Sequence, residues 1–154
     1  MDFLPYSKEA YITELERRDS LRRALSLPMG LSIVLAGGLF SLFKNFNWEP
    51  TLTCSATLFG ISWVLGFIFL MLAVWYLIRS HIGYEYAYVP TPKEIREYYD
   101  KLKEYYASGV EEGCPDTDVN GYLAREYADN AHHNALNNNS KSSRLHRASL
   151  CLVG

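Results

Sequence analysis

The sequence predicts an all-α membrane protein in which a two-helix transmembrane hairpin carries cytosolic amphipathic helices. Three observations lead to this fold class: a run of 23 residues without charge, an uncharged run of 20 residues before it, and a helical spacing of apolar residues in the second half of the chain. The 154 residues divide into a basic juxtamembrane helix (1–26), the hairpin (27–78, with spans at 27–45 and 56–78) and a cytosolic helical region (79–154).

The longest uncharged run, from Ala56 to Ile78, determines the class of the protein. As a helix it is about 35 Å long, enough to cross a hydrocarbon core of about 30 Å. In lipid its backbone can be satisfied only as a helix, because a single segment cannot close a barrel. The run from Ala24 to Phe43 is the second crossing. It is weaker because it contains three glycines and Pro28, which starts a new helix or kinks a continuous one.

Small residues recur four positions apart in both spans, and such spacing lets two helix backbones approach closely in lipid. The residues are Gly37, Ser41, Ser62 and Gly66. They can pack the two spans together or pack one subunit against another, and chance also produces this pattern in apolar segments. Neither span carries an ionisable group in its interior, which argues against ion-coupled transport by this chain alone.

Basic residues flank the two spans unequally. Residues 1–23 hold five Lys or Arg, residues 79–110 hold five more, and the connection 44–55 holds one. The positive-inside rule therefore places both termini in the cytoplasm. Four of the N-terminal bases cluster just before the first span: Arg17, Arg18, Arg22 and Arg23. Either this helix is solvated and its arginines fix the topology, or it lies at the membrane interface and its arginines bind anionic lipid headgroups.

The clearest helix outside the spans begins at Thr91, where Pro92 and Glu94 complete a capping pattern. Its apolar stripe needs a surface to cover it. The stripe is formed by Ile95, Tyr98, Tyr99, Leu102, Tyr105 and Tyr106. That surface is either intramolecular (another cytosolic helix or the membrane interface) or a self-association or partner face, since tyrosine is favoured at protein contacts. The preceding connector, 80–92, is expected to be extended, although its alternating tyrosines would also suit a short strand.

The last predicted helix begins at Asp118 or Asn120 and carries three asparagines at four-residue spacing: Asn130, Asn134 and Asn138. Asparagine is a poor interior helix residue, so its repetition needs a reason. One interpretation is a polar seam, or a water-filled lumen, between copies of this helix. The other is a frayed, solvated segment, because NNNSKSS is low in complexity. The final ASLCLVG follows basic residues and either returns towards the membrane or lies on the bilayer.

No stretch of the sequence indicates a chemistry. Catalytic triads, phosphate loops and dinucleotide-binding motifs are not found, and His132 and His133 are adjacent and cannot share a metal on one helix face. The three cysteines are far apart and odd in number, so they predict neither a disulfide framework nor a metal pair. The net charge of −2 gives no general affinity for nucleic acid. The sequence predicts a non-enzymatic protein without catalytic residues, cofactor or metal.

The order of parts resembles the small two-transmembrane effectors of bacterial anti-phage systems, such as those paired with retrons or cyclic-oligonucleotide signalling. It consists of a basic helix (Glu14 to Arg23), two membrane segments and a short helical part without catalytic motifs. The resemblance implies a latent inner-membrane protein that oligomerises on a signal and disrupts or permeabilises the membrane, which causes abortive infection. The alternative is a membrane-anchored adaptor whose tyrosine-rich helix binds a partner protein. The expected partners are the lipid bilayer, further copies of the chain, and a cytosolic protein or signal.

Overall fold

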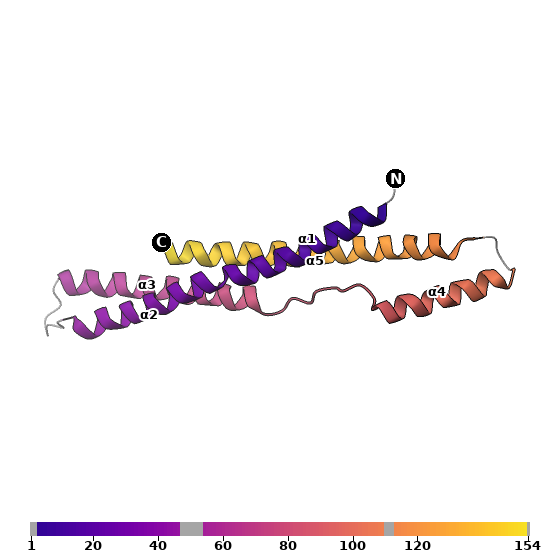
Figure 1. Cartoon of the computed structure of the whole chain (residues 1–154). Coiled ribbons are helices and arrows are strands. Elements are labelled where there is room, and N and C mark those ends of the chain that lie inside the picture. The colour runs from indigo at the N-terminus through magenta and orange to yellow at the C-terminus, as the bar shows by residue number, and fades with distance from the viewer. Residues whose placement is uncertain (1–2, 47–53, 110–112, 154) are drawn as a thin grey trace. The chain divides into compact units, whose positions relative to one another are not determined.

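The structure, a computed structural model, describes residues 3–46, 54–109 and 113–153. These residues are helical for most of their length and contain no strand, so the all-helical prediction is confirmed. The short connection expected between the two spans falls largely on residues 47–53, outside the described residues. The helices of the described chain (Figure 1) are α1 (Phe3–Ala24), α2 (Ser26–Asn45), α3 (Cys54–His81), α4 (Pro92–Ala107) and α5 (Pro115–Val153).

The chain forms two compact units. The first unit consists of residues 1–18 and 85–138, which include most of α1, all of α4 and the first part of α5. The second unit consists of residues 19–84 and 139–154, which include α2, α3 and the ends of α1 and α5. Residues from the far end of the sequence are therefore grouped with the two apolar helices.

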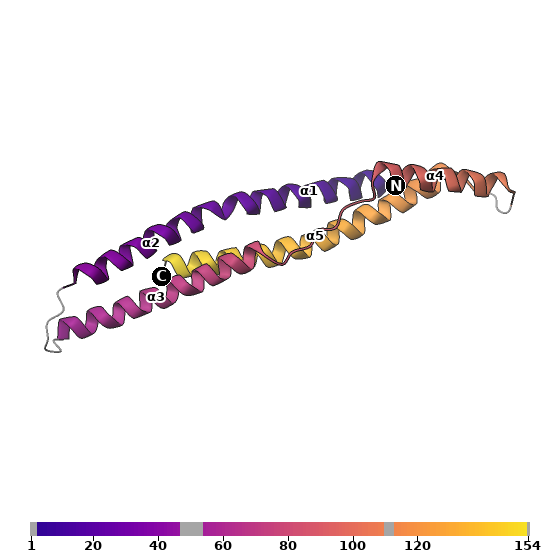
Figure 2. The same cartoon turned by 90° about the horizontal axis from the view of Figure 1, so that it is seen from below.

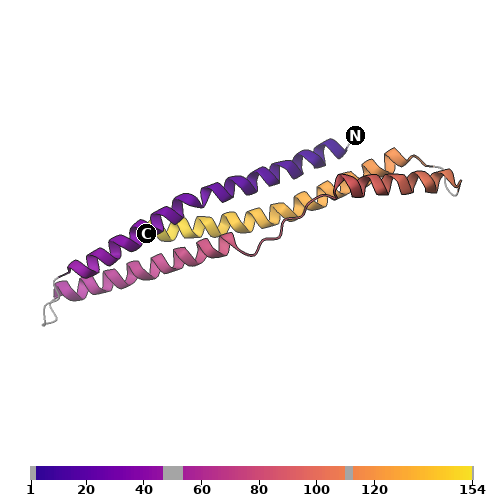
Figure 3. The same cartoon turned by 60° about the horizontal axis from the view of Figure 1, so that its bottom comes forward.

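In the second unit, α2 and α3 lie side by side (Figures 2 and 3). Trp63 of α3 donates a hydrogen bond from its indole Nε1 to the backbone oxygen of Leu39 in α2, at 2.9 Å. The ring centroids of Phe43 and Trp63 are 4.8 Å apart, and those of Phe46 and Phe59 are stacked at 3.9 Å. Aromatic side chains therefore form much of the contact within this helix pair.

Two helical stretches are long and apolar enough to cross a membrane: Cys54–His81, which is α3, and Phe3–Asn45, which contains α2. Only 17% of the most apolar window in each is buried. The core helix of a soluble protein would bury most of such a window. Side chains such as Ile33 and Phe40 are instead 73% and 69% exposed. Length, composition and exposure agree with membrane association.

The end of α5 packs against this helix pair within the second unit. Leu145 and Ala148 form a buried apolar cluster with Leu25 and Leu77. The last described residues, 151–153, line a cavity of about 230 Å³ with side chains of α2 and α3. From the sequence, this final segment is expected either to return towards the membrane or to lie on the bilayer. In the structure it is helical and packs against α2 and α3.

The start of α1 corrects one prediction. From the sequence, Ser7 is expected to cap this helix, since serine is a preferred N-cap residue. The helix instead begins at Phe3, so Ser7 lies inside it and is buried. The Ser7 hydroxyl donates to the backbone oxygens of Phe3 (3.0 Å) and Leu4 (3.1 Å). A cap accepts from amides that follow it, whereas this hydroxyl donates to carbonyls that precede it. Ser7 is therefore an interior helix residue, and the prediction of a cap there is wrong.

Pro28 explains the division between α1 and α2. The proline has no N–H to donate to the carbonyl of Ala24, where α1 ends. Leu25 nevertheless keeps right-handed helical angles (φ −66°, ψ −27°), and the next bond, from Met29 N to Leu25 O, is present at 3.2 Å. The interruption is thus a missing hydrogen bond rather than a loop.

The predicted cap of α4 is confirmed. The amide of Glu94 donates to Thr91 Oγ1 at 3.4 Å, and the amide and hydroxyl of Thr91 donate to Glu94 Oε2 at 2.7 and 2.9 Å. The Thr91 amide lowers the pKa of the Glu94 carboxyl from its usual 4.5 by stabilising the charged form. At the other end, Gly109 leaves the helix with φ +71°, a conformation that glycine adopts without strain.

Replacing Thr91 with Ala should destabilise the first turn of α4 by about 1 kcal/mol, because the Glu94 amide loses its acceptor. Hydrogen exchange of the amides at 93–95 in the purified chain should then accelerate about five-fold at pH 7. Glu94→Gln should have a related effect that depends on pH. Because the folded pKa is lowered, the contribution of Glu94 is complete above the unfolded value near 4.5 and is lost as the pH falls through the folded value.

Ser108→Ala is the control for this experiment, since the Ser108 hydroxyl donates to Tyr105 O at the opposite end of α4. It should leave exchange at 93–95 unchanged. Equal acceleration in Thr91→Ala and Ser108→Ala would show that the capping contacts do not stabilise the first turn.

Candidate functional site

A connected polar cluster lies in the first unit, where α5 faces α1 and the extended segment that precedes α4. At its centre are Asn134 and Asn138, both with 0% of their surface exposed. They stand one helical turn apart on the same face of α5. With their partners Glu14, Tyr86 and Ala87, they form what we call the asparagine clamp.

Asn134 pairs with the main chain of the extended segment. Its Nδ2 donates to Ala87 O at 3.0 Å, and its Oδ1 accepts from Ala87 N at 2.9 Å. One side-chain amide thus satisfies both backbone groups of one residue, as a neighbouring strand would. The segment is therefore extended without a partner strand, which confirms the interpretation of an extended connector.

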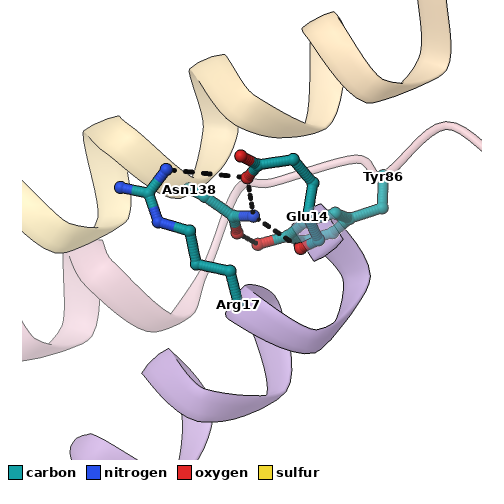
Figure 4. Close-up of polar contacts among 4 residues, drawn as sticks. All are labelled: Glu14, Arg17, Tyr86 and Asn138. Carbon is teal, nitrogen blue, oxygen red and sulfur yellow. Dashed lines mark hydrogen bonds and ion pairs between the residues drawn. The ribbon is translucent and has the colours of Figure 1, made fainter. Parts of the chain in front are cut away.

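Asn138 joins three parts of the unit at one point (Figure 4). Its Oδ1 accepts from the Tyr86 hydroxyl at 2.8 Å, and its Nδ2 donates to Glu14 O and Glu14 Oε2, both at 2.8 Å. Arg17 Nη1 lies 3.6 Å from Glu14 Oε2 and forms an ion pair with it. The contacts of Asn138 therefore hold α1, the connector and α5 together.

Further contacts fix the connector around the clamp. Arg18 Nη1 donates to the Tyr88 hydroxyl at 2.8 Å, and the Arg18 guanidinium lies 5.4 Å from the centre of the Tyr86 ring. His133 Nε2 lies within hydrogen-bond distance of Glu85 O, at 2.9 Å. The connector is thus held through its backbone and its tyrosines, from α1 on one side and α5 on the other.

The asparagines correct the sequence interpretation in one respect. A frayed, solvated segment is wrong, because α5 continues as a helix through all three of them. Asn134 and Asn138 direct their amides to partners in the same chain, so a seam between copies remains a prediction. Asn130 differs from them, because its buried Nδ2 has no hydrogen-bond partner among the described residues.

The four arginines proposed for lipid headgroups fall into two groups. Arg17 and Arg18 belong to the first unit, where they contact Glu14 and the connector. Arg22 and Arg23 belong to the second unit and are exposed. The structure thus gives Arg17 and Arg18 partners within the chain, and the binding of lipid headgroups by the four arginines stays a prediction.

The tyrosine stripe of α4 lies partly against α5. The ring of Tyr98 is 4.9 Å from that of Tyr122, and the Tyr106 hydroxyl donates to the Asp118 carboxylate. Burial raises the pKa of Tyr122, because it disfavours the phenolate. Tyr98 and Tyr105 nevertheless keep 37% and 42% of their surface exposed. The remaining stripe residues, Ile95, Tyr99 and Leu102, are half-buried.

Only one of the four small residues lies at the contact between α2 and α3. A Cβ on Gly66 would lie 3.4 Å from Leu39 Cδ2, an ordinary van der Waals distance. A Cβ on Gly37 would have no atom within 4 Å, and Ser41 and Ser62 are exposed. Within one chain, packing of the helix pair through small residues is therefore observed at Gly66 and not at the other three positions.

The chemistry of the described residues is that of a hydrogen-bond network. No group of three or more His, Cys, Asp or Glu side chains suited to a metal ion occurs among residues 3–46, 54–109 and 113–153. Backbone hydrogen bonds from Thr117 and Asp116 lower the pKa of the exposed Cys114 thiol, just before α5. The clamp itself joins α1, the connector and α5 through hydrogen bonds.

The partners of the asparagines were not found from the sequence. Glu14 and Asn138 are 124 positions apart, and Ala87 takes part only through its backbone, which carries no sequence signal. Two signals do point to the clamp: a four-residue asparagine repeat within a helical segment, and the tyrosines that alternate along the connector.

Asn134→Ala should destabilise the clamp by about 2 kcal/mol, because the backbone groups of Ala87 lose both partners. In the purified full chain, hydrogen exchange at the Ala87 amide should accelerate at least about tenfold. Asn130→Ala is the matched control, since the Asn130 amide nitrogen has no hydrogen bond to lose, and it should change that rate less than about two-fold. A comparable acceleration in both variants would mean that general loosening of α5, not the clamp, controls the connector.

No family model, curated protein or solved structure matches this chain.

Proposed function

We propose that this chain is a non-enzymatic, multi-pass protein of a bacterial inner membrane that self-associates and disrupts or permeabilises the bilayer. In this proposal, α2 and α3 are the transmembrane hairpin and both termini are cytoplasmic. One observation carries it: the apolar side chains of α2 and α3 are exposed along both helices, with 17% of each apolar window buried. In water this surface would be costly, whereas in lipid it is solvated.

The distribution of charge supports the orientation. The sequence of the second unit contains seven Lys or Arg and only two Asp or Glu. Six of the seven bases flank the apolar cluster of Leu25, Leu77 and Leu145, and the seventh, Lys44, lies at the other end of α2. We call these six the basic collar: Arg22, Arg23, Arg79, Lys141, Arg144 and Arg147. A one-sided collar is the pattern expected at the cytoplasmic surface.

A face of α2 is suited to self-association in lipid. Gly30, Gly37 and Ser41 follow one another at spacings of seven and four, so they share one face of the helix. A Cβ on either glycine would meet no atom of the chain within 4 Å, and Ser41 is exposed. Small residues at this spacing allow a second helix to approach closely. This supports packing between subunits rather than within one chain.

The proposed role is that of a latent anti-phage effector that causes abortive infection when a signal reaches it. The clamp is the element such a signal would release, because it holds the connector by which the chain leaves α3. A membrane-anchored adaptor is the second candidate. The partial exposure of Tyr98 and Tyr105 favours it, since both side chains retain surface for a partner protein.

The variant Gly37→Ile should block self-association, because a branched side chain would fill the small-residue face of α2, where an added Cβ meets no atom of its own chain within 4 Å. Induced expression of the unaltered protein, together with its trigger, should depolarise cells stained with a membrane-potential dye. Gly37→Ile should abolish this depolarisation and lower cross-linked oligomer at least about tenfold. Ala36→Ile is the matched control, since Ala36 is the neighbouring exposed residue on a different face, and it should depolarise cells normally.

Three results would contradict the proposal. Recovery of the chain from lysate without detergent would exclude membrane insertion. Normal potential and growth with the trigger present would favour the adaptor. Equal loss of depolarisation in both Ile variants would show that the small-residue face has no particular role.

A further inference from the structure

An apolar groove of about 280 Å³ runs between α2 and α3 within the second unit. Its wall contains one serine, Ser32, whose hydroxyl donates to Pro28 O at 2.8 Å and is thus already bonded. The remaining surface is almost entirely hydrocarbon. Its principal lining residues are Met29, Ile33, Val74, Ile78, Ile82 and His81. Such a groove suits a flexible hydrocarbon chain better than a polar ligand.

A basic side chain stands above each wall of the groove. Arg22 precedes Met29 by seven residues and Ile33 by eleven, so the three share one helix face. Because Leu25 keeps helical backbone angles, the helical periodicity continues through the junction between α1 and α2. On the opposite wall, His81 is the last residue of α3 and is exposed. His81 therefore lines the groove, and Arg22 lies on the helix face that continues its other wall; both side chains can bind phosphate.

Apart from Arg22 and its neighbour Arg23, the basic collar comes from the end of α5 and from Arg79. Leu145 and Ala148 are buried beside Leu25 and Leu77, which brings their neighbours Arg144 and Arg147 to the same level. Arg144 Nη1 donates to Arg79 O at 2.7 Å and so fixes α5 to α3. Six bases thus gather at this end of the described unit.

The charge of this collar is unbalanced within its own unit. Asp19 is the one acidic residue among the described residues 19–46, 54–84 and 139–153. Arg22, Arg23 and Arg147 are exposed. Basic groups in such excess attract an anionic partner, and the adjoining hydrocarbon groove specifies one that carries an acyl chain.

We propose that this end of the second unit binds an anionic phospholipid, with one acyl chain in the groove and the phosphate at Arg22 and His81, surrounded by the collar. The site rests on the proposed membrane insertion and adds a defined lipid to it. The bound lipid fills the groove between α2 and α3 and neutralises part of the collar. It thereby stabilises the packing of three helices that share few polar contacts.

Native mass spectrometry of the detergent-purified full chain tests the site, with phosphatidylglycerol and phosphatidylcholine of identical acyl chains as probes. Phosphatidylglycerol should remain bound and phosphatidylcholine should be lost. Arg22→Gln should lower retention of phosphatidylglycerol about five-fold, as expected for one basic group near an anionic surface. Lys44→Gln is the matched control, because it removes one base from the last turn of α2, at the end away from the groove mouth, and it should leave retention unchanged.

A second pair of variants tests the groove. Ile33→Trp fills it, whereas Val34→Trp places the same side chain at a neighbouring residue that is equally exposed (73% and 70%) but does not line the groove. Retention of phosphatidylglycerol should fall at least about five-fold in Ile33→Trp alone. Because both positions face outwards, both variants should fold.

The outcomes separate this inference from the proposed function. Equal retention of the two lipids, equal effects of Arg22→Gln and Lys44→Gln, or equal effects of the two Trp variants would overturn the lipid site. If the chain still depolarised membranes in those cases, the proposed function would stand without it. A chain that was soluble without detergent would overturn both.

Discussion

Every buried backbone N–H and C=O must find a hydrogen-bond partner, and both units of this protein are organised by that requirement. In the second unit, α2 and α3 meet it within each helix, which is why their apolar side chains can face outwards and still suit a lipid environment. In the first unit an extended segment has to pass between helices without a neighbouring strand. Asn134 supplies the missing partner by pairing with both backbone groups of Ala87. Asn134 thus meets a requirement of the connector beside it.

Charge is distributed between the units in a way that the whole-chain value conceals. The net charge is −2, yet the first unit contains fifteen acidic and eight basic residues, whereas the second contains two and seven. The acidic unit is rich in polar contacts among helices. The basic unit combines an apolar surface with a collar of positive charge at one end. This combination, rather than any single motif, supports a position at an anionic membrane surface.

Local features were predictable from the sequence. The cap of α4 could be predicted because Thr91 and Glu94, which form it, lie only three residues apart in the sequence. The two apolar spans could be predicted from composition alone. Ser7 does not cap α1, because the helix begins four residues earlier, at Phe3. The partners of Asn138 were beyond reach, since a contact across 124 positions leaves no periodic trace.

The contacts of the helix pair show the same limit. Small residues predicted its packing, but Trp63 and its neighbouring rings form much of the contact, and Gly66 alone among the four small residues takes part. From sequence alone, an aromatic residue in an apolar run is equally compatible with facing lipid and with packing against another helix. Nor did the sequence reveal that Arg144 and Arg147 join Arg22 at one end of the apolar helices, because that depends on where α5 lies.

The way in which α5 holds the connector also determines which substitutions the protein can accept there. Asn134 contacts position 87 only through main-chain atoms, so almost any side chain is compatible with that contact. Proline is the exception, since it lacks the amide hydrogen. Position 86 is different, because Asn138 is bonded to the phenol oxygen itself and a phenylalanine there would leave the carboxamide oxygen bare. Two adjacent positions of one short segment should therefore differ in what they tolerate during divergence: position 87 accepts any residue with a backbone amide hydrogen, whereas position 86 needs a side-chain hydroxyl.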